Sequence, residues 1–338
     1  MEQYELKETI SLADENGNLA STVGFARRPY WHYNREDLNV KRWRLKEWDY
    51  YLVNTGKIAV AFTMSDLGYV RMASISYLDL ETKLDATKTI LKAPSKERVM
   101  PIESETGHSY FRTGKMILDY KSEPGRKHVR CYIPDFYNGK DFRADLMFKD
   151  IPEESMNILT PWPDRKHFYL NEKVNCMPVA GTVVFDGQVT RFNPEEHCGV
   201  LDWGRGYWPY KSRWYWGTAS AMVDGKPFGF NLGYGFGDLS AASENVLFFE
   251  GKVHKLGRVF FQIPQDPMQP WIISSDDGRF EALFTPEFDR KADINLQVIR
   301  SNQNQYFGKV NGIAILDEGS QYAMKDIPAA FEDIINQY

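Results

Sequence analysis

Apolar and polar residues alternate in short runs along most of the chain, and turn residues separate the runs. Residues 48–53 and 57–64 are strand-like and flank Asn54-Thr55-Gly56, which predicts a hairpin, and Val70 to Leu80 extends it into a meander. Four further turn signals divide later strand-like runs: Asp186-Gly187, Asp224-Gly225, Asn311-Gly312 and Asp317-Glu318-Gly319. The pattern predicts antiparallel strands joined by tight turns.

Helical periodicity is sparse. The best candidates are a short stretch from Glu36 to Asn39 and the tail from Ile327 to Tyr338, where Pro328 suits a first helical turn. The predicted fold class is therefore all-β and mostly antiparallel, with few short helices.

The length of 338 residues exceeds the usual size of one domain, which favours two units. Prolines cluster with polar residues between two strand-rich regions, so residues 150–178 are expected to form a crossover. We predict an N-terminal β unit over residues 1–170 and a C-terminal β unit over residues 171–338. Each is expected to be a barrel or a curled sheet, which leaves no long exposed edge.

Composition strengthens the β prediction and narrows the partners. Aromatic residues make up 14% of the chain, and large rings pack well on pleated surfaces. The net charge of -5 offers no attraction to phosphate backbones, so nucleic acid is not an expected partner. Met1 to Glu8 lacks the order of a secretory signal, and no apolar run approaches the ~20 residues of a membrane span. We expect a cytoplasmic protein of undetermined oligomeric state.

Standard catalytic signatures are absent from the sequence. The three cysteines are widely spaced and form no Cys-x-x-Cys pair, and there is no phosphate loop, nucleophile elbow or His-Glu-x-x-His helix. Gly229 to Gly237 resembles strand alternation rather than a turn that opens a helix, as a dinucleotide site requires. We therefore predict no cofactor and no metal, and take the cysteines as small buried apolar residues.

The segment from Asp202 to Tyr210 is the strongest functional candidate. Asp202 and Arg205 are three residues apart in what we interpret as a glycine-broken loop, where the cation would hold the carboxylate ionised. Trp208 and Tyr210 are candidate ligand contacts beside this pair. The alternative is that the pair only pins a loop and the tryptophans belong to the core.

A second set of candidates follows along the chain. Trp214 and Trp216 share one face of a predicted strand, as either a core wall or a pocket floor. Asn231 begins a stretch of small residues alternating with bulky ones. With Asp202, the candidate catalytic residues are three more titratable side chains: Asp238, Glu244 and His254. One interpretation is an acid–base set around a cavity, and the alternative is that each lies at the surface or in a turn.

Lys46 and Trp48 form the last candidate. They lie two apart in a predicted strand and share a face, which suits an anionic head group above an aromatic wall. A strand that displays cations to solvent explains the same pattern.

Taken in order, these blocks resemble a bacterial family of unknown function among the calycin-like, lipocalin-related proteins. The residues that carry the resemblance are Lys46 to Tyr51, Asp66 to Tyr69, Asp202 to Tyr210, Trp214 to Gly217 and Asn231 to Asp238. The resemblance implies two lipocalin-like β-barrels, distantly similar to carotenoid 1,2-hydratase and AttH-like proteins. Some members of that wider group are cofactor-independent hydratases or cyclases, but the family itself implies no activity.

Three hypotheses about function follow. The first is binding of a hydrophobic small molecule, such as a lipid or isoprenoid, in a β-barrel cavity, because aromatic excess with a few polar groups is typical of such cavities. The second is a hydratase, cyclase or isomerase that uses a buried carboxyl, Asp202 or Asp238, as general acid. The third is a structural role in which the aromatic residues pair with another chain.

Overall fold

The computed structural model describes residues 3–95, 97–296 and 299–337 and is almost entirely antiparallel β-structure, as predicted. It contains two large sheets and one small parallel pair, β1 (Ile10–Ser11) with β3 (Trp31–His32). Two 3₁₀ turns, η1 (Arg35–Asp37) and η2 (Arg42–Arg44), precede the first long strand. Across the described residues, no helix is long and apolar enough to cross a membrane.

The first sheet has thirteen strands. They are β2 (Gly24–Ala26), β4 (Lys46–Asn54), β5 (Ile58–Asp66), β6 (Arg71–Asp79), β7 (Leu84–Lys92), β8 (Gly107–Thr113), β9 (Met116–Glu123), β10 (Arg126–Tyr137), β11 (Lys140–Lys149), β12 (Met156–Pro161), β13 (Phe168–Phe185), β14 (Gln188–Phe192) and β15 (Cys198–Tyr207). The main path runs β7-β6-β5-β4-β15-β13-β11-β10-β9-β8. The meander of β4 to β7 and the meander of β8 to β11 are therefore joined through β15 and β13.

The second sheet has nine strands in the order β19-β18-β17-β16-β24-β23-β22-β21-β20. They are β16 (Lys211–Val223), β17 (Lys226–Tyr234), β18 (Val246–Phe249), β19 (Lys252–Lys255), β20 (Val259–Gln262), β21 (Trp271–Ser275), β22 (Phe280–Leu296), β23 (Ile299–Ile315) and β24 (Gln321–Gln337). β24 follows every other strand in the chain but lies in the middle of the sheet, between β16 and β23.

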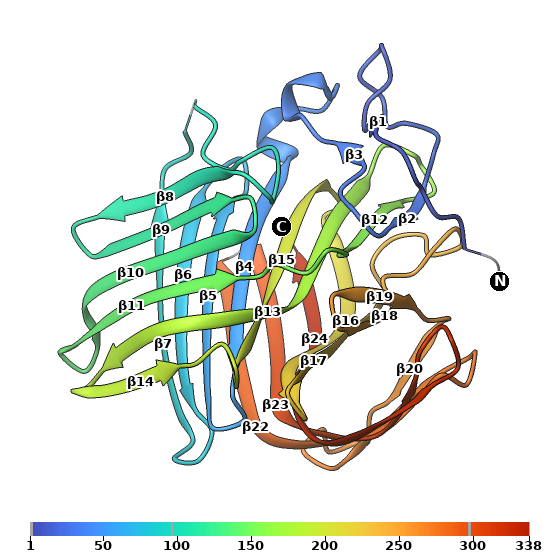
Figure 1. Ribbon diagram of the computed structural model, residues 1–338. Helices are drawn as coiled ribbons and strands as arrows, with labels where there is room; N and C mark the ends of the chain where they lie inside the picture. The colour runs from blue at the N-terminus through green and yellow to red at the C-terminus, as the bar shows by residue number, and fades with distance from the viewer. Residues whose placement is uncertain (1–2, 96, 297–298, 338) are drawn as a thin grey trace.

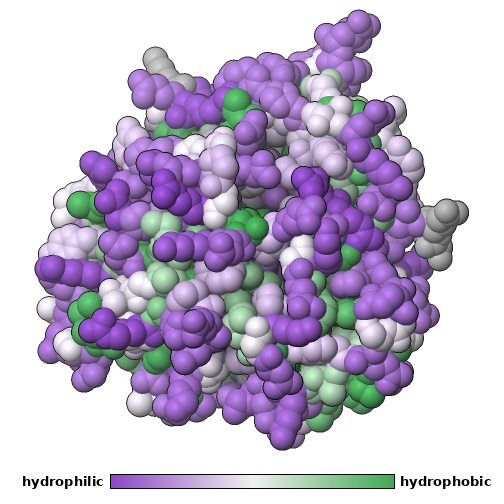
Figure 2. Space-filling model, viewed as in Figure 1, coloured by the Kyte–Doolittle hydropathy of each residue, from purple (hydrophilic) through white to green (hydrophobic). Residues whose placement is uncertain are grey.

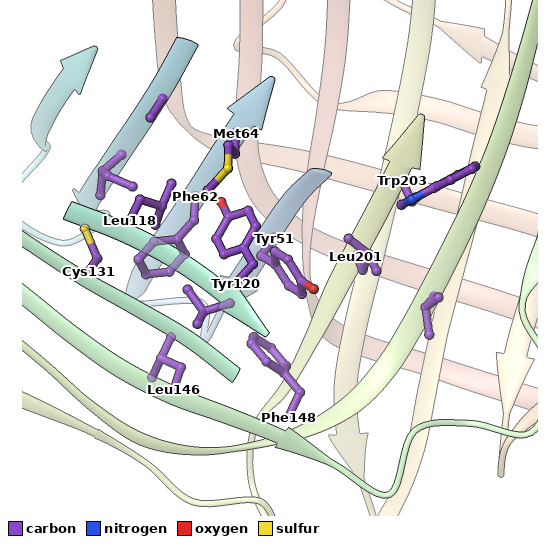
Figure 3. Close-up of a cluster of buried hydrophobic side chains, with 14 of the residues drawn as sticks. Tyr51, Phe62, Met64, Leu118, Tyr120, Cys131, Leu146, Phe148, Leu201 and Trp203 are labelled. Atoms are coloured by element: carbon purple, nitrogen blue, oxygen red, sulfur yellow. The ribbon is translucent and has the colours of Figure 1, made fainter. Parts of the chain in front are cut away.

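Each sheet curls around its own apolar core (Figure 1). In the first sheet, rings from β4 meet rings from the opposite side of the curl: Tyr51 lies 4.9 Å from Tyr120 and 5.4 Å from Phe148 between ring centroids. Figure 3 shows these three rings close together, with Leu201 and then Trp203 of β15 farther to the right. In the second sheet, Trp271 and Phe331 are central, 5.8 Å apart.

The two sheets also pack on each other. Leu52 and Val200, on the outer face of the first sheet, belong to one buried cluster with Phe307 and Ala330 of the second. The cluster is apolar because both contributing surfaces face another sheet rather than water. On the side of the molecule seen in Figure 2, by contrast, hydrophilic side chains cover most of the surface.

The hairpin and turn predictions are confirmed at five places. β4 pairs with β5 across Asn54-Thr55-Gly56, and β5 with β6. Asp186-Gly187 joins β13 to β14, and Asp224-Gly225 joins β16 to β17, with both aspartates at positive φ as tight hairpin turns require. Asp317-Glu318-Gly319 lies between β23 and β24.

Three local predictions are wrong. The tail from Ile327 to Gln337 is strand rather than helix, because its backbone pairs with strands on both sides and its apolar side chains pack into the cores. Asn311-Gly312 lies inside β23, where a register shift accommodates it. The expected crossover at residues 150–178 contains β12 and the long β13, and the change of sheet falls later, between Tyr207 and Lys211. The division into units at residue 170 stays a prediction.

Near Glu36, where a short helix was expected, the chain makes only the single 3₁₀ turn η1. Asn34 caps it by accepting a hydrogen bond from the backbone N–H of Glu36. The segment is too short to bury an apolar helical face.

Candidate functional site

Three neighbouring strands, β4, β15 and β13, form the wall of the first sheet that faces the second sheet. Their register places Lys173, Asp202 and Tyr50 in one row across the wall. The next row on the same face is Asn171, Gly204 and Trp48. Side chains at alternate positions of a strand point to opposite faces, so these rows form one surface.

The same alternation divides the segment that begins at Asp202. Asp202 and Gly204 face the second sheet, whereas Trp203 and Arg205 point into the first curl. The expected glycine-broken loop is instead strand β15 as far as Tyr207. The predicted pairing of Asp202 with Arg205 is therefore wrong, since a separation of three places the two side chains on opposite faces.

The space between the wall and the second sheet, which we call the seam, holds a cluster of charged side chains. The Lys173 ammonium lies 2.7 Å from a carboxylate oxygen of Asp202 and 3.7 Å from one of Glu244. It also lies 4.8 Å from the ring centroid of Trp216. Lys173 is only 3% exposed, while Asp202 and Glu244 are 14% and 17% exposed. The ammonium group of the cluster is thus shielded from solvent, whereas its two carboxylates are partly accessible to solvent.

Glu332 of β24 supplies a third carboxyl to the seam. It pairs in register with Trp216 and Gln305. Gln305 donates to one of its oxygens at 2.7 Å, and the Trp214 indole N–H points to the other at 3.5 Å. Burial, followed by the negative charge of Asp202, raises the pKa of Glu332 to about 7, which the positive charge of Lys173 only partly offsets. Glu332 is therefore a carboxyl that can carry a proton near neutral pH.

Two asparagines hold these carboxylates in place. The Asn171 amide donates to Asp202 at 2.7 Å and also contacts the Tyr169 hydroxyl. The Asn231 amide donates to Glu244 at 2.9 Å while its oxygen accepts from the Trp216 indole at 2.7 Å. Both asparagines are fully buried. Such fixed donors orient carboxylates before any ligand binds.

An aromatic cluster adjoins the charged seam. Phe236 lies at its centre, with ring centroids of the surrounding residues 4.9 to 5.6 Å away. The surrounding rings are those of Trp162, Tyr169, Trp208 and Trp214. Trp48 stacks on Tyr169 at 5.3 Å and extends the cluster along the wall. Half-buried Phe236 connects the cluster to solvent.

Glycine makes room for these rings at one position in particular. A Cβ atom on Gly204 would lie 2.3 Å from the Trp48 ring. Real side chains do not approach so closely, so the Trp48 stack on Tyr169 requires glycine at this point of β15.

Arg205 belongs to a second charged cluster inside the first curl. It is fully buried and donates to the Trp48 carbonyl at 2.8 Å, to Asp49 at 3.0 Å and to the Pro101 carbonyl at 3.1 Å. Its Nε lies 3.8 Å from Glu47, which also accepts from Arg35 at 2.7 Å. Burial raises the pKa of Glu47 and of Asp49, and in both cases Arg205 is the largest opposing influence.

The predicted acid–base set of Asp238, Glu244 and His254 is not assembled. Asp238 is exposed and accepts from the backbone N–H of Ser240, which lowers its pKa, so it has no character of a neutral general acid. His254 accepts from the backbone N–H of Asp317 at 3.1 Å, and burial lowers its pKa. Only Glu244 reaches the seam.

Lys46 and Tyr210 also lie outside the charged cluster. Lys46 is buried, donates to the Leu67 carbonyl at 3.1 Å and lies 4.5 Å from the Tyr69 ring centroid. Burial lowers its pKa to about 8. Tyr210 is 46% exposed, beyond the end of β15. The register of β4 places Lys46 and Trp48 on one face, as predicted, although the two side chains contact different rings. The head-group site stays a prediction.

Four residues escaped the sequence reasoning: three of the seam, and Phe236 of the aromatic cluster. Lys173 and Asn171 lie in a run of polar residues within a long strand, and polar side chains that interrupt a strand are a usable signal of a buried site. Glu332 lay in the segment that we interpreted as a helix. Phe236 carried no signal, since its role depends on rings from four distant segments.

No metal site emerges from the described part of the chain, where no group of three or more His, Cys, Asp or Glu residues has suitable geometry. Two surface hollows, of about 280 and 550 Å³, lie on the outer face of β10, β11 and β13. Residues of the seam line neither of them.

Comparisons with known proteins place the chain in a family. A family model described as "Domain of unknown function (DUF2804)" matches residues 3–338. The resemblance inferred from the sequence to a family of unknown function is thereby confirmed. A search of curated proteins found no match.

Two solved structures are similar to this chain. Kievitone hydratase from Nectria haematococca shares 9% identity and a TM-score of 0.43, over 87% of this chain and 88% of that chain. A provisionally assigned AttH protein from Nitrosomonas europaea shares 12% identity and a TM-score of 0.48, over 87% of this chain and 92% of that chain.

Proposed function

Since the chain belongs to the DUF2804 family, whose description names no activity, we propose its function from the seam: acid–base catalysis on an apolar small molecule. The single observation that carries the proposal is the placement of the Glu332 carboxyl, held by Gln305 and Trp214, beside the ion pair of Asp202 and Lys173, where burial raises its pKa to about 7. A neutral carboxyl and an ionised one in the same site are suited to give and accept a proton.

The proposed reaction class is addition or removal of water, or isomerisation, at a carbon–carbon double bond. In the addition, Glu332 gives its proton to one carbon, and a water oxygen bonds to the other. That water loses a proton to Asp202. Transfer of this proton from Asp202 to Glu332 restores the starting state. The Lys173 ammonium lies 2.7 Å from the Asp202 carboxylate, and the Asn171 amide fixes the orientation of that carboxylate.

The substrate is proposed to be apolar because rings surround the polar groups. The carboxyls of Asp202, Glu244 and Glu332, which we call the acid cluster, have three rings directly beside them: Trp48, Tyr169 and Trp214. Aromatic walls with few polar groups are typical of sites for apolar ligands. The same walls limit the access of bulk water, which strengthens electrostatic interactions within the site.

The test is a titration of the Glu332 carboxyl by difference infrared spectroscopy, comparing the protein with its Glu332→Gln variant. The carboxylic-acid band is expected to disappear on alkalinisation with a midpoint near pH 7. A midpoint near the ordinary value of 4.5 would contradict the assignment of Glu332 as a general acid.

Turnover supplies the second test. Alkenes and unsaturated carbonyl compounds are incubated with the protein in D₂O, and deuterium incorporation is measured by mass spectrometry. Incorporation is expected to be lost in Glu332→Gln and Asp202→Asn and retained in Asp238→Asn, which changes an exposed carboxyl. Unchanged incorporation in both seam variants would exclude the proposed roles.

A second candidate function is binding of a hydrophobic small molecule without chemistry. The aromatic cluster around Phe236 favours it, because these rings form a site whether or not a proton moves. Native mass spectrometry of the purified protein distinguishes the two: a copurified, chemically unaltered apolar ligand that persists in the Glu332→Gln variant supports binding alone.

A further inference from the structure

We propose that Phe236 occupies a binding site for an aromatic ring, and that a six-membered aromatic ring of a small molecule binds there by displacing it. This inference rests on the proposed function, since the ring site adjoins the acid cluster of the seam. It adds the class of ligand, a single aromatic ring with a polar substituent, and identifies Phe236 as the side chain that fills the site in the free protein.

The geometry around Phe236 is that of a ring site rather than of an ordinary core. Four rings surround it, and each makes an edge-to-face contact, with interplanar angles from 64° to 89°. The four come from separate segments: the β12–β13 turn, β13, the residues after β15, and β16. Edge-to-face contacts favour an aromatic partner over an aliphatic one of equal size.

The backbone that carries Phe236 is suited to withdraw the ring. Gly235 and Gly237 flank it, at φ of +93° and +82°, in the loop between β17 and β18. The loop lies outside the strand ladders that hold Tyr169 and Trp214, and after Gly237 the backbone N–H of Asp238 donates to the Pro161 carbonyl at 2.7 Å. Phe236 is half-buried, so the ring has a path to solvent. Glycines on both sides leave the phenyl group free to rotate out of the site.

Two of the surrounding rings connect this site to the acid cluster. The Tyr169 hydroxyl contacts the amide of Asn171, which donates to Asp202. The Trp214 indole N–H points to Glu332. A ligand ring in place of Phe236 therefore lies between Trp214, whose indole N–H points to Glu332, and Tyr169, whose hydroxyl is linked to Asp202 through the Asn171 amide. A substituent on that ring is directed along the same path toward Asp202 and Glu332.

The experiment measures binding of phenol by isothermal titration calorimetry and by quenching of tryptophan fluorescence. Phe236→Ala is expected to bind phenol at least ten-fold more tightly than the unmodified protein, because the ligand no longer competes with the side chain. Cyclohexanol, which has nearly the same size without aromaticity, is expected to bind at least five-fold more weakly than phenol to the variant.

A matched control removes another half-buried phenyl group from an aromatic contact. Phe249 lies 5.3 Å from the Tyr322 ring and away from the seam, and Phe249→Ala is expected to bind phenol no better than the unmodified protein. Circular dichroism and thermal unfolding verify that both variants are folded. No gain of affinity in folded Phe236→Ala, an equal gain in Phe249→Ala, or equal binding of cyclohexanol overturns the ring site.

The ring site and the proposed chemistry fail separately. Phenol binding to Phe236→Ala is expected to survive the additional change Glu332→Gln, because the contacts come from rings. Loss of the Glu332 titration near pH 7 with retained phenol binding would remove the acid–base proposal and leave the ring site. A Glu332 titration near pH 7 without phenol binding to Phe236→Ala would remove the ring site and leave the acid–base proposal.

Discussion

Replacement of Arg205 by methionine tests the charged cluster inside the first curl. Methionine keeps much of the apolar length of the side chain and removes the charge. Arg205 is fully buried and holds Asp49 at 3.0 Å, with Glu47 at 3.8 Å from its Nε. The variant therefore leaves two buried carboxylates with less compensation, although Arg35 still reaches Glu47 at 2.7 Å.

The expected loss in the free energy of unfolding is about 3–5 kcal/mol, the usual consequence of removing one partner of a buried ion pair. The loss is expected to shrink at acidic pH. Burial already raises the pKa of Asp49, and without Arg205 its pKa rises further, so protonation removes the uncompensated charge as pH falls.

Urea unfolding at pH 5 and pH 8, followed by circular dichroism, measures both effects. The matched control is Arg213→Met, since Arg213 pairs with Asp333 at 2.8 Å but is 49% exposed. Exposed pairs contribute about 0–1 kcal/mol, so this variant is expected to lose little. Adding Asp49→Asn to Arg205→Met is expected to recover part of the loss, because it removes one stranded charge.

Similar losses in Arg205→Met and Arg213→Met would refute the reasoning, because burial would then have no energetic consequence. A loss in Arg205→Met that is the same at both pH values would refute the explanation by stranded carboxylates while leaving the packing of the side chain as the cause.

Two further predictions concern the seam. Gly204→Ala is expected to destabilise the protein by about 1–3 kcal/mol and to change its tryptophan fluorescence, because the new Cβ lies 2.3 Å from the Trp48 ring. The control is Gly114→Ala, whose Cβ would have no atom within 4 Å and which should change stability by less than about 0.5 kcal/mol. Equal losses of stability in the two variants would contradict this prediction. Glu332 has a folded-state pKa near 7 against an ordinary 4.5, so the folded state binds its proton more tightly and the contribution of Glu332 to stability falls as pH rises through this window. Urea unfolding should show this fall reduced in Glu332→Gln, and an identical pH profile would contradict it.

Much of the fold could be predicted from the sequence because its strands and turns are encoded locally. The alternation of residues 48–64 and the Asp-Gly turns each specify a hairpin without reference to the rest of the chain. The tail after Ile327 could not be assigned in this way. Its pattern is ambiguous between helix and strand, and the distant partners β16 and β23 decide it.

Many residues of the seam could be identified from the sequence, but their contacts with one another could not. Asp202, Asn231, Glu244, Trp214 and Trp216 were all singled out, and the structure brings them to one seam. The partner of Asp202 was assigned incorrectly because strand geometry separates neighbours three apart. The true partner is Lys173, its neighbour across the ladder between β13 and β15, and sequence proximity does not reveal such a pair.

The central place of β24 ties the proposed activity to the order of synthesis. Chains emerge from the ribosome in sequence order, and domains fold as their segments become available. All strands of the first sheet precede Lys211, so that sheet can form while β24 is still being made. The second sheet lacks its middle strand until β24 appears, and β24 carries Glu332. A nascent chain therefore contains the wall with Asp202 before it contains Glu332, and the proposed proton transfer requires a completed second sheet.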